Sequence, residues 1–218
     1  MTRSHTAALL ACLAAGSLLA GCADPMRSRN LADPTVSAVT LAQQVCANCH
    51  GAQCNATSPN FPNLAGQTES YLTGQLRAYK SHDRSDPAGF QYMWGISRSL
   101  TDEQILGLAA YYAVQQPTVQ PLESSLDRIV AGRLVFENGV PAEAVPACVG
   151  CHGSKGMGNI GFPRLAGQHA DYIAKQLVVF QRTDERPDGA VMKVVSHGLT
   201  RQNIDDVASY LQALKQKR

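Results

Sequence analysis

Two five-residue strings decide how this chain folds: Cys46-Ala47-Asn48-Cys49-His50 and Cys148-Val149-Gly150-Cys151-His152. The pattern Cys-x-x-Cys-His is the attachment signature of a c-type haem. In that chemistry both cysteines bond to the porphyrin as thioethers, and the histidine donates a ring nitrogen to the iron. The sequence therefore predicts two covalently bound haem c groups, with Cys46, Cys49, Cys148 and Cys151 as attachment residues and His50 and His152 as iron ligands.

Two other kinds of site use Cys-x-x-Cys pairs. Zinc ribbons usually separate their pairs by about 15–20 residues, whereas about a hundred residues separate these pairs. A lone pair can also be a dithiol redox site. Neither alternative accounts for a histidine directly after both pairs, so haem attachment is the preferred interpretation.

The N-terminal segment is typical of an exported protein. Arg3 precedes an apolar run over residues 7–19, which is shorter than the about 20 residues that span a bilayer and fits a signal peptide. The run ends in Leu19-Ala20-Gly21-Cys22, which resembles a bacterial lipobox. We expect a signal peptide over residues 1–21 and a lipid anchor on Cys22, on the periplasmic side of a bacterial membrane. Ordinary cleavage near Ala20 or Ala23 would instead give a soluble periplasmic protein.

Charge and cysteine content narrow the function further. The chain has 19 Lys and Arg against 17 Asp and Glu, and this near-neutral balance does not suggest binding to nucleic acid. Apart from Cys12 in the signal segment, the predicted anchor and the haem cysteines, only Cys54 remains. We expect Cys54 to be a loop residue without a special role, with an intermolecular disulfide as the alternative.

The chain contains an internal repeat of about one hundred residues, present in two copies. Pro62-Asn63-Leu64-Ala65-Gly66-Gln67 returns as Pro163-Arg164-Leu165-Ala166-Gly167-Gln168. A Tyr…Gln-Leu pattern, a methionine and a Leu-Thr pair follow in both copies: Tyr71, Gln75, Leu76, Met93 and Leu100-Thr101, then Tyr172, Gln176, Leu177, Met192 and Leu199-Thr200. Pro117 and Pro121 mark a linker. We therefore expect a polar tether over residues 22–36, domains over residues 37–116 and 126–218, and a linker over residues 117–125.

Each copy is predicted to be all-α, since no convincing strand alternation occurs. First helices are expected near residues 40–45 and 127–138, and middle helices near residues 69–79 and 171–180. The last helix of copy one starts with a capping box formed by Thr101 and Gln104. Apolar residues then follow at helical spacing in both copies. Thr200 lacks the reciprocal Gln or Glu in copy two.

One axial position of each iron stays open after histidine binds. Met93 and Met192 are the leading candidates, since each lies at the same interval before a Leu-Thr pair. The alternative is that each is a core methionine. His82, His169 and especially His197 could compete, although a surface position or one beside the haem carboxylates fits them better. The carbonyls of Pro62 and Pro163 are candidates to orient the histidines, and plain loop prolines are the alternative.

These features, repeated in order over about residues 37–218, resemble the dihaem cytochrome c4 family. The resemblance implies two tandem class I cytochrome c domains, each a small helical fold around one haem, with facing haems. It implies the axial pairs His50/Met93 and His152/Met192. It also implies that the carbonyls of Pro62 and Pro163 orient the histidines. Cys54 departs from the family's loop, which is usually free of cysteine.

A chain with both axial positions filled is expected to carry electrons rather than to act as an enzyme. The resemblance suggests a quinol:cytochrome c reductase as donor and a terminal oxidase as acceptor. A second possibility is the dihaem electron-transfer subunit of a dehydrogenase, such as a flavocytochrome. A third is a haem enzyme with one open or His-ligated iron. Because folding and cofactor binding are coupled in small metal-dependent domains, the haem-free chain is expected to fold poorly.

Overall fold

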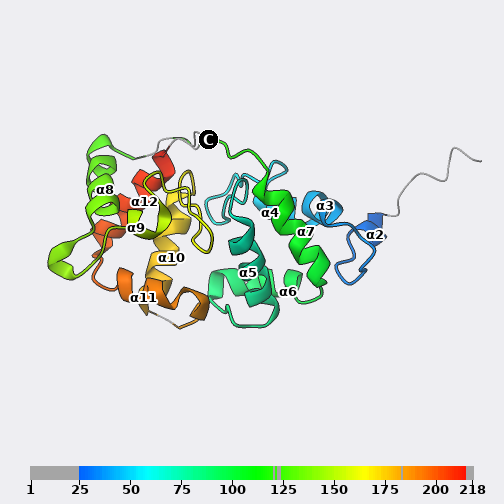
Figure 1. The fold of residues 1–218 in the computed structure, drawn as a ribbon. Coiled ribbons are helices and arrows are strands. Elements are labelled where there is room, and N and C mark those ends of the chain that lie inside the picture. Colours follow the sequence, from blue (N-terminus) through cyan, green and yellow to red (C-terminus); the bar gives the residue numbers. More distant parts are fainter. Residues whose placement is uncertain (1–24, 120, 122–123, 183, 215–218) are drawn as a thin grey trace, which may run out of the picture.

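The computed structural model describes residues 25–119, 121, 124–182 and 184–214. The predicted signal peptide and Cys22 lie outside these residues. Within them every named element is a helix, and pairing between extended segments is limited to two isolated β-bridges. Figure 1 shows two helical halves side by side. The all-α expectation is therefore confirmed.

The first half is built from the elements between residues 38 and 113. Its first three elements run on without a break, so the first Cys-x-x-Cys-His string ends a helix. The helices are α3 (Ala38–Leu41), the π-helical η1 (Ala42–Cys46), α4 (Ala47–His50), α5 (Glu69–Lys80), α6 (Pro87–Ser97) and α7 (Asp102–Ala113). A short helix α2 (Pro25–Ser28) precedes them.

The second half repeats this order with one difference. Its first helix ends ten residues before Cys148, so the second string forms a separate helical turn. The elements are α8 (Leu126–Asn138), η2 (Pro141–Glu143), α9 (Val149–His152), α10 (Ala170–Arg182), η3 (Pro187–Gly189), α11 (Ala190–Ser196) and α12 (Arg201–Ala213). The first, middle and last helices fall where the sequence predicts them, but α6 and α11 were not predicted.

Glycines let the first and last helices of each half cross closely. A Cβ atom on Gly132 of α8 would lie 1.9 Å from the carbonyl oxygen of Asp206 on α12. On α7, a Cβ on Gly107 would lie 2.7 Å from the Cβ of Ala38 on α3. Helix axes can approach to this extent only where a side chain is missing, so these glycines fix the crossing of the helix pair that frames each site.

Each half has its own hydrophobic core. The first gathers buried side chains between Val36 and Tyr112, and the second gathers those between Val135 and Leu211. Leu108 and Ala109 of α7 are buried, as are Val207 and Ala208 of α12. The helical spacing noted in the sequence therefore marks the core face of both last helices.

The cap of α12 differs from the sequence expectation. Thr200 accepts a hydrogen bond from the backbone N–H of Asn203, and the Asn203 side chain accepts one from the backbone N–H of Thr200. This is a complete capping box, in which the shorter Asn replaces the Gln or Glu that the usual pattern requires.

The described part of the predicted tether packs against the first half. Val36 is buried and Leu31 is partly buried against the core. The Gln104 side chain donates hydrogen bonds of 3.0 Å to the carbonyls of Asp33 and Val36. Residues 31–36 therefore belong to the surface of the first half rather than extending freely from it.

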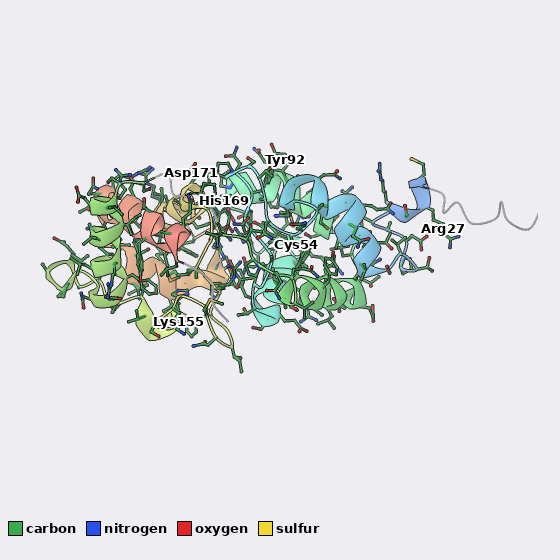
Figure 2. The ribbon with its side chains drawn as sticks, turned by 90° about the horizontal axis from the view of Figure 1, so that it is seen from above. Arg27, Cys54, Tyr92, Lys155, His169 and Asp171 are labelled. Atoms are coloured by element: carbon green, nitrogen blue, oxygen red, sulfur yellow. The ribbon has the colours of Figure 1, made fainter. Side chains whose placement is uncertain are left out.

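Cys54 is more constrained than a plain loop residue. It is 2% exposed and lies in the core of the first half (Figure 2), with a φ of +61°. Gly156 takes the same place in the second half, with a φ of +62°. Burial raises the pKa of the Cys54 thiol to about 11. A buried, protonated thiol is poorly placed for an intermolecular disulfide.

None of the described helices is both long and apolar enough to cross a membrane.

Candidate haem-binding sites

Both attachment strings present their cysteines on one helical turn. Cys46 and Cys49 are partly buried, Cys148 is partly buried, and Cys151 is exposed, all four as free thiols. His50 and His152 end their helices and are 7% and 6% exposed. One turn thus offers two thiols beside a buried imidazole, which is the donor set that haem c requires.

The two histidines are oriented in the same way. The Nδ1 atom of His50 lies 2.9 Å from the carbonyl oxygen of Pro62, and that of His152 lies 3.0 Å from the carbonyl oxygen of Pro163. Because a carbonyl can only accept, each Nδ1 carries the proton and donates it. The lone pair of each Nε2 is therefore left for a metal, as in other histidine ligands that are fixed by a carbonyl.

Burial keeps both imidazoles in the form that binds iron. It lowers the pKa of His50 and of His152, and the hydrogen bond to the proline carbonyl opposes this only in part. A ring with a lowered pKa is neutral at physiological pH, and the neutral ring is the metal ligand. Burial also raises the pKa of the Cys46 thiol and brings that of Cys148 to about 11.

The two candidate methionines occupy equivalent helices. Met93 lies on α6 and Met192 on α11, each partly buried. The carbonyl oxygen of each accepts a 2.6 Å hydrogen bond from a serine hydroxyl one turn later, Ser97 and Ser196 respectively. The register seen in the sequence is therefore kept in the structure.

Apolar side chains beside the methionines suit a large apolar cofactor. Tyr92 on α6 and Val191 and Val194 on α11 are all more than half exposed. The Phe61 ring meets His50 edge-on at 6.2 Å and Tyr92 at 6.1 Å, so it links the first string to α6. A porphyrin would cover such a face, and the residues present therefore fit haem.

Among the described residues, no group of three or more His, Cys, Asp or Glu side chains is placed to hold a metal ion.

The rival histidines lie in three different environments. His82 packs edge-on against Phe90 and Trp94, at 4.9 and 4.6 Å, and His197 is exposed. His169, which we expected at the surface or near the haem carboxylates, is buried where the halves meet (Figure 2). Its Nε2 lies 2.9 Å from the carbonyl oxygen of Ala56 in the first half.

Sequence reasoning missed the polar contact between the halves. Gln67 accepts from the backbone N–H of Arg164 and donates to its carbonyl, at 2.7 and 3.0 Å. Gln168 makes the same pair of bonds to Asn63, at 2.8 and 3.0 Å. The halves are thus related by a pseudo-twofold exchange of glutamine side chains. The signal was the repeated Gln of the Pro-x-Leu-Ala-Gly-Gln segment.

A second buried cluster continues this contact. The Gln75 side-chain oxygen accepts from Arg84 of its own half and from Arg186 of the other, and Gln176 accepts from the same two arginines. Asp86 forms a 2.6 Å ion pair with Arg84. Two arginines and two glutamines, each pair repeated between the copies, therefore join α5 of the first half to α10 of the second by buried hydrogen bonds.

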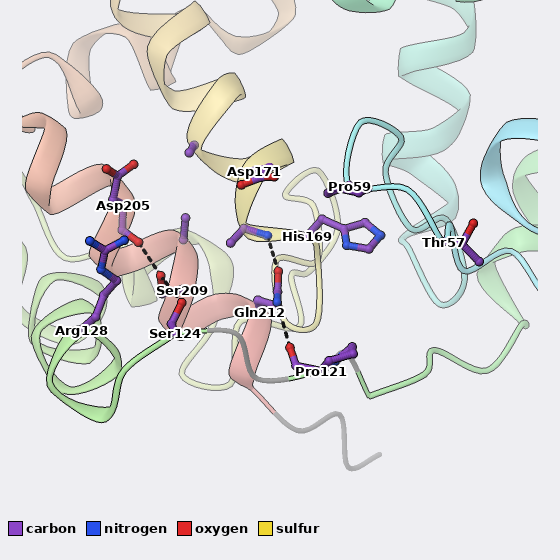
Figure 3. Close-up of a pocket in the computed structure, with 13 residues that line it drawn as sticks. Thr57, Pro59, Pro121, Ser124, Arg128, His169, Asp171, Asp205, Ser209 and Gln212 are labelled. Carbon is purple, nitrogen blue, oxygen red and sulfur yellow. Dashed lines mark hydrogen bonds between the residues drawn. The ribbon is translucent and has the colours of Figure 1, made fainter.

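A polar cavity of about 300 Å³ also opens at this boundary (Figure 3). Thr57 and Pro59 of the first half line it together with His169, Asp171 and Arg128 of the second. On one side Gln212 bridges the backbone N–H of Ala170 and the carbonyl of Pro121, at 2.7 and 3.0 Å. No residue of either attachment string lines this cavity.

Comparison with known proteins agrees with this geometry. A family model described as cytochrome c matches the chain twice, over residues 37–113 and 129–215. Two such domains, each with its own attachment string, define a c-type cytochrome with two haems.

Individual relatives identify the family within the c-type cytochromes. The chain is 39% identical to a cytochrome c4 of Pseudomonas aeruginosa over 78% of this chain and 84% of that protein. It resembles the solved structure of Acidithiobacillus ferrooxidans cytochrome c4 with a TM-score of 0.72 and 39% identity, covering 78% of this chain and 98% of the other. The chain therefore belongs to the cytochrome c4 family of dihaem electron-transfer proteins.

A further relative has a more specific name. The chain is 32% identical to a thiosulfate dehydrogenase electron acceptor of Stutzerimonas stutzeri, over 81% of this chain and 82% of that protein.

Proposed function

We propose that His50 with Met93, and His152 with Met192, are the axial pairs of the two haems, and that the protein carries single electrons between respiratory-chain partners. The observation that carries this proposal is the repeated unit itself. In both halves a buried histidine is fixed by a proline carbonyl, and a methionine follows on a short helix in the same register.

The chemistry follows from this ligand set. Haem supplies reversible one-electron exchange at iron, and a neutral thioether ligand favours the ferrous state and raises the potential. The chain contributes the rest: the carbonyls of Pro62 and Pro163 fix the imidazoles and burial keeps them neutral, while Met93 and Met192 would each supply a thioether to one haem. A haem held by the chain on both sides would exchange electrons and leave no room for a substrate.

Partners and location form a second part of the proposal. The attachment chemistry and the N-terminal segment support a periplasmic protein anchored through Cys22, with a soluble periplasmic form if that anchor is absent. A quinol:cytochrome c reductase as donor and a terminal oxidase as acceptor suit a carrier of this family. Transient redox partners bind through small interfaces, often under about 1,200 Å² in total.

A dehydrogenase as electron donor is the alternative that a specific observation favours. The chain matches two relatives that are named thiosulfate dehydrogenase electron acceptors, and each match covers about four fifths of the relative's length. A dehydrogenase that co-purifies with the protein, or that reduces it faster than a quinol:cytochrome c reductase does, would favour this alternative.

Single methionine variants test the axial pairs directly. Replacing Met93 or Met192 by leucine should remove half of the weak red methionine-to-ferric band and create one high-spin iron that binds carbon monoxide or cyanide. Met157 lies outside the repeat and provides the control, since Met157→Leu should leave the spectrum unchanged. If Met93→Leu or Met192→Leu retains the whole band, that methionine is not a ligand. The haem-enzyme alternative would then need to be considered.

A further inference from the structure

Arg164 breaks the pseudo-twofold relation between the halves. It follows Pro163, whose carbonyl orients His152, and its equivalent in the first half is the neutral Asn63. Both residues are 1% exposed and exchange backbone hydrogen bonds with a glutamine of the opposite half. The boundary between the domains therefore carries one positive charge that the repeat does not require.

The guanidinium of Arg164 contacts both halves through backbone carbonyls. One terminal nitrogen donates to Ala166 of its own half, and the other donates to Ala65 of the first half at 2.6 Å. Ala65 lies three residues after Pro62, whose carbonyl orients His50. Arg164 is thus tied into both of the short segments that hold the iron-binding histidines.

Within the described residues, no Asp or Glu side chain pairs with the guanidinium of Arg164. The ion pairs of the described residues do not include Arg164, and its Nε atom has no hydrogen-bond partner among them. By contrast, the buried Arg84 has Asp86 at 2.6 Å and Arg186 has Asp188 at 3.9 Å. Burial lowers the pKa of Arg164 to about 10, so it remains protonated at neutral pH.

We propose that Arg164 raises the reduction potential of both haems. Reduction adds one electron to an iron, so a fixed positive charge nearby stabilises the ferrous state relative to the ferric state. The charge acts strongly because it is buried, where the effective dielectric constant is well below that of water. A unit charge on the order of 10 Å from a redox centre, at an effective dielectric constant of about 20, changes a one-electron equilibrium about tenfold.

This inference rests on the proposed haem ligation, and the experiment separates the two. The variants are Arg164→Met, Arg164→Gln and Arg164→Lys, with Arg133→Met on the exposed face of α8 as control. Each purified holoprotein is first checked for two haems per chain and a full methionine-to-ferric band. Both midpoint potentials are then measured by optical redox titration. A wild-type protein without the band would refute the ligation itself, whatever Arg164 does.

The comparison between Lys and Gln is decisive because the two side chains are similar in size and differ in charge. We expect Arg164→Lys and Arg133→Met to titrate close to the wild type. Arg164→Gln and Arg164→Met should lower both potentials by about 59 mV, which is tenfold for one electron. If the Lys and Gln variants have the same midpoint potentials and differ from wild type only in thermal stability, the role of Arg164 is structural and the proposal fails. Should Arg164→Met not fold, the Lys and Gln variants still decide.

Discussion

Replacing Gln168 by leucine should weaken the contact between the two domains more than any surface substitution. Gln168 is buried, and its side chain satisfies the backbone N–H and the carbonyl of Asn63 across the domain boundary, at 2.8 and 3.0 Å. Its side-chain oxygen also accepts from the N–H of His169 at 3.0 Å. Leucine has a similar size but can satisfy none of these groups.

The magnitude follows from the groups left without partners. A buried donor or acceptor that loses its partner costs about 1–3 kcal/mol. Three such groups remain, two on Asn63 and the N–H of His169, so we expect a loss of roughly 3–6 kcal/mol in the free energy of unfolding, allowing for partial relaxation. Because the bonds join the domains, the loss should also separate the two domains' unfolding transitions.

Chemical denaturation of the holoprotein, followed by circular dichroism and by haem absorbance, measures both effects. Gln43→Leu on the exposed side of η1 is the matched control and should change little. The double variant with Gln67→Leu should lose less than the sum of the single losses, because the two exchanges share one boundary. A Gln168→Leu protein with wild-type stability and a single coincident transition would show that the Gln168 hydrogen bonds do not hold the domains together.

Three further changes test the fold. Asp86→Ala removes the carboxylate paired with Arg84, where the two side chains are 1% and 3% exposed. Because the buried guanidinium loses its counter-ion, the free energy of unfolding measured by chemical denaturation should fall by about 3–5 kcal/mol. A loss under 1 kcal/mol would contradict this prediction. Gly132→Ala places a Cβ against the backbone of Asp206 and should lower stability by about 3 kcal/mol or more. The control Gly74→Ala has open space around it and should raise stability by up to about 1 kcal/mol. Equal shifts in melting temperature for the two variants would contradict the close crossing of α8 and α12. Thr200→Ala opens the capping box of α12 and should cost about 1 kcal/mol, so an unchanged melting temperature would show that the box contributes nothing.

The strings and the repeat predict most of the haem sites, because covalent attachment needs fixed residue types at fixed spacing. The same repeat pointed to the proline carbonyls, and the structure places them 2.9 and 3.0 Å from the histidines. Met93 and Met192 keep their register on α6 and α11. Neither helix was predicted, because α6 begins at a proline and has no clear apolar stripe and α11 has only seven residues, so their position depends on packing.

The contact between domains could not be predicted from local patterns. Gln75 and Arg84 lie far from Gln176 and Arg186 in sequence, and nothing in a single segment shows that polar side chains will be buried together. Only their recurrence in both copies hinted at a shared role. The packing of residues 31–36 on the first half was missed for a related reason, since Leu31 and Val36 are too few to form a periodic pattern.

Cys54 occupies a position at which the two copies use different residues for the same backbone turn. Its loop accepts the same two backbone hydrogen bonds as the loop of Gly156, so both positions need a left-handed backbone. Glycine meets that need without strain, whereas the first copy uses a cysteine and buries its thiol. The sequence marks Cys54 as unusual, but only the fold shows that it replaces a turn glycine.

The haem content and the optical spectra of the purified protein, oxidised and reduced, test the two haem sites most directly. Two closed His/Met sites should give two haems per chain, low-spin iron throughout, and the methionine-to-ferric band at the strength of two sites, with no reaction with carbon monoxide. One haem per chain, a high-spin component or half of that band would contradict two closed sites and with them the assignment of both domains as electron carriers.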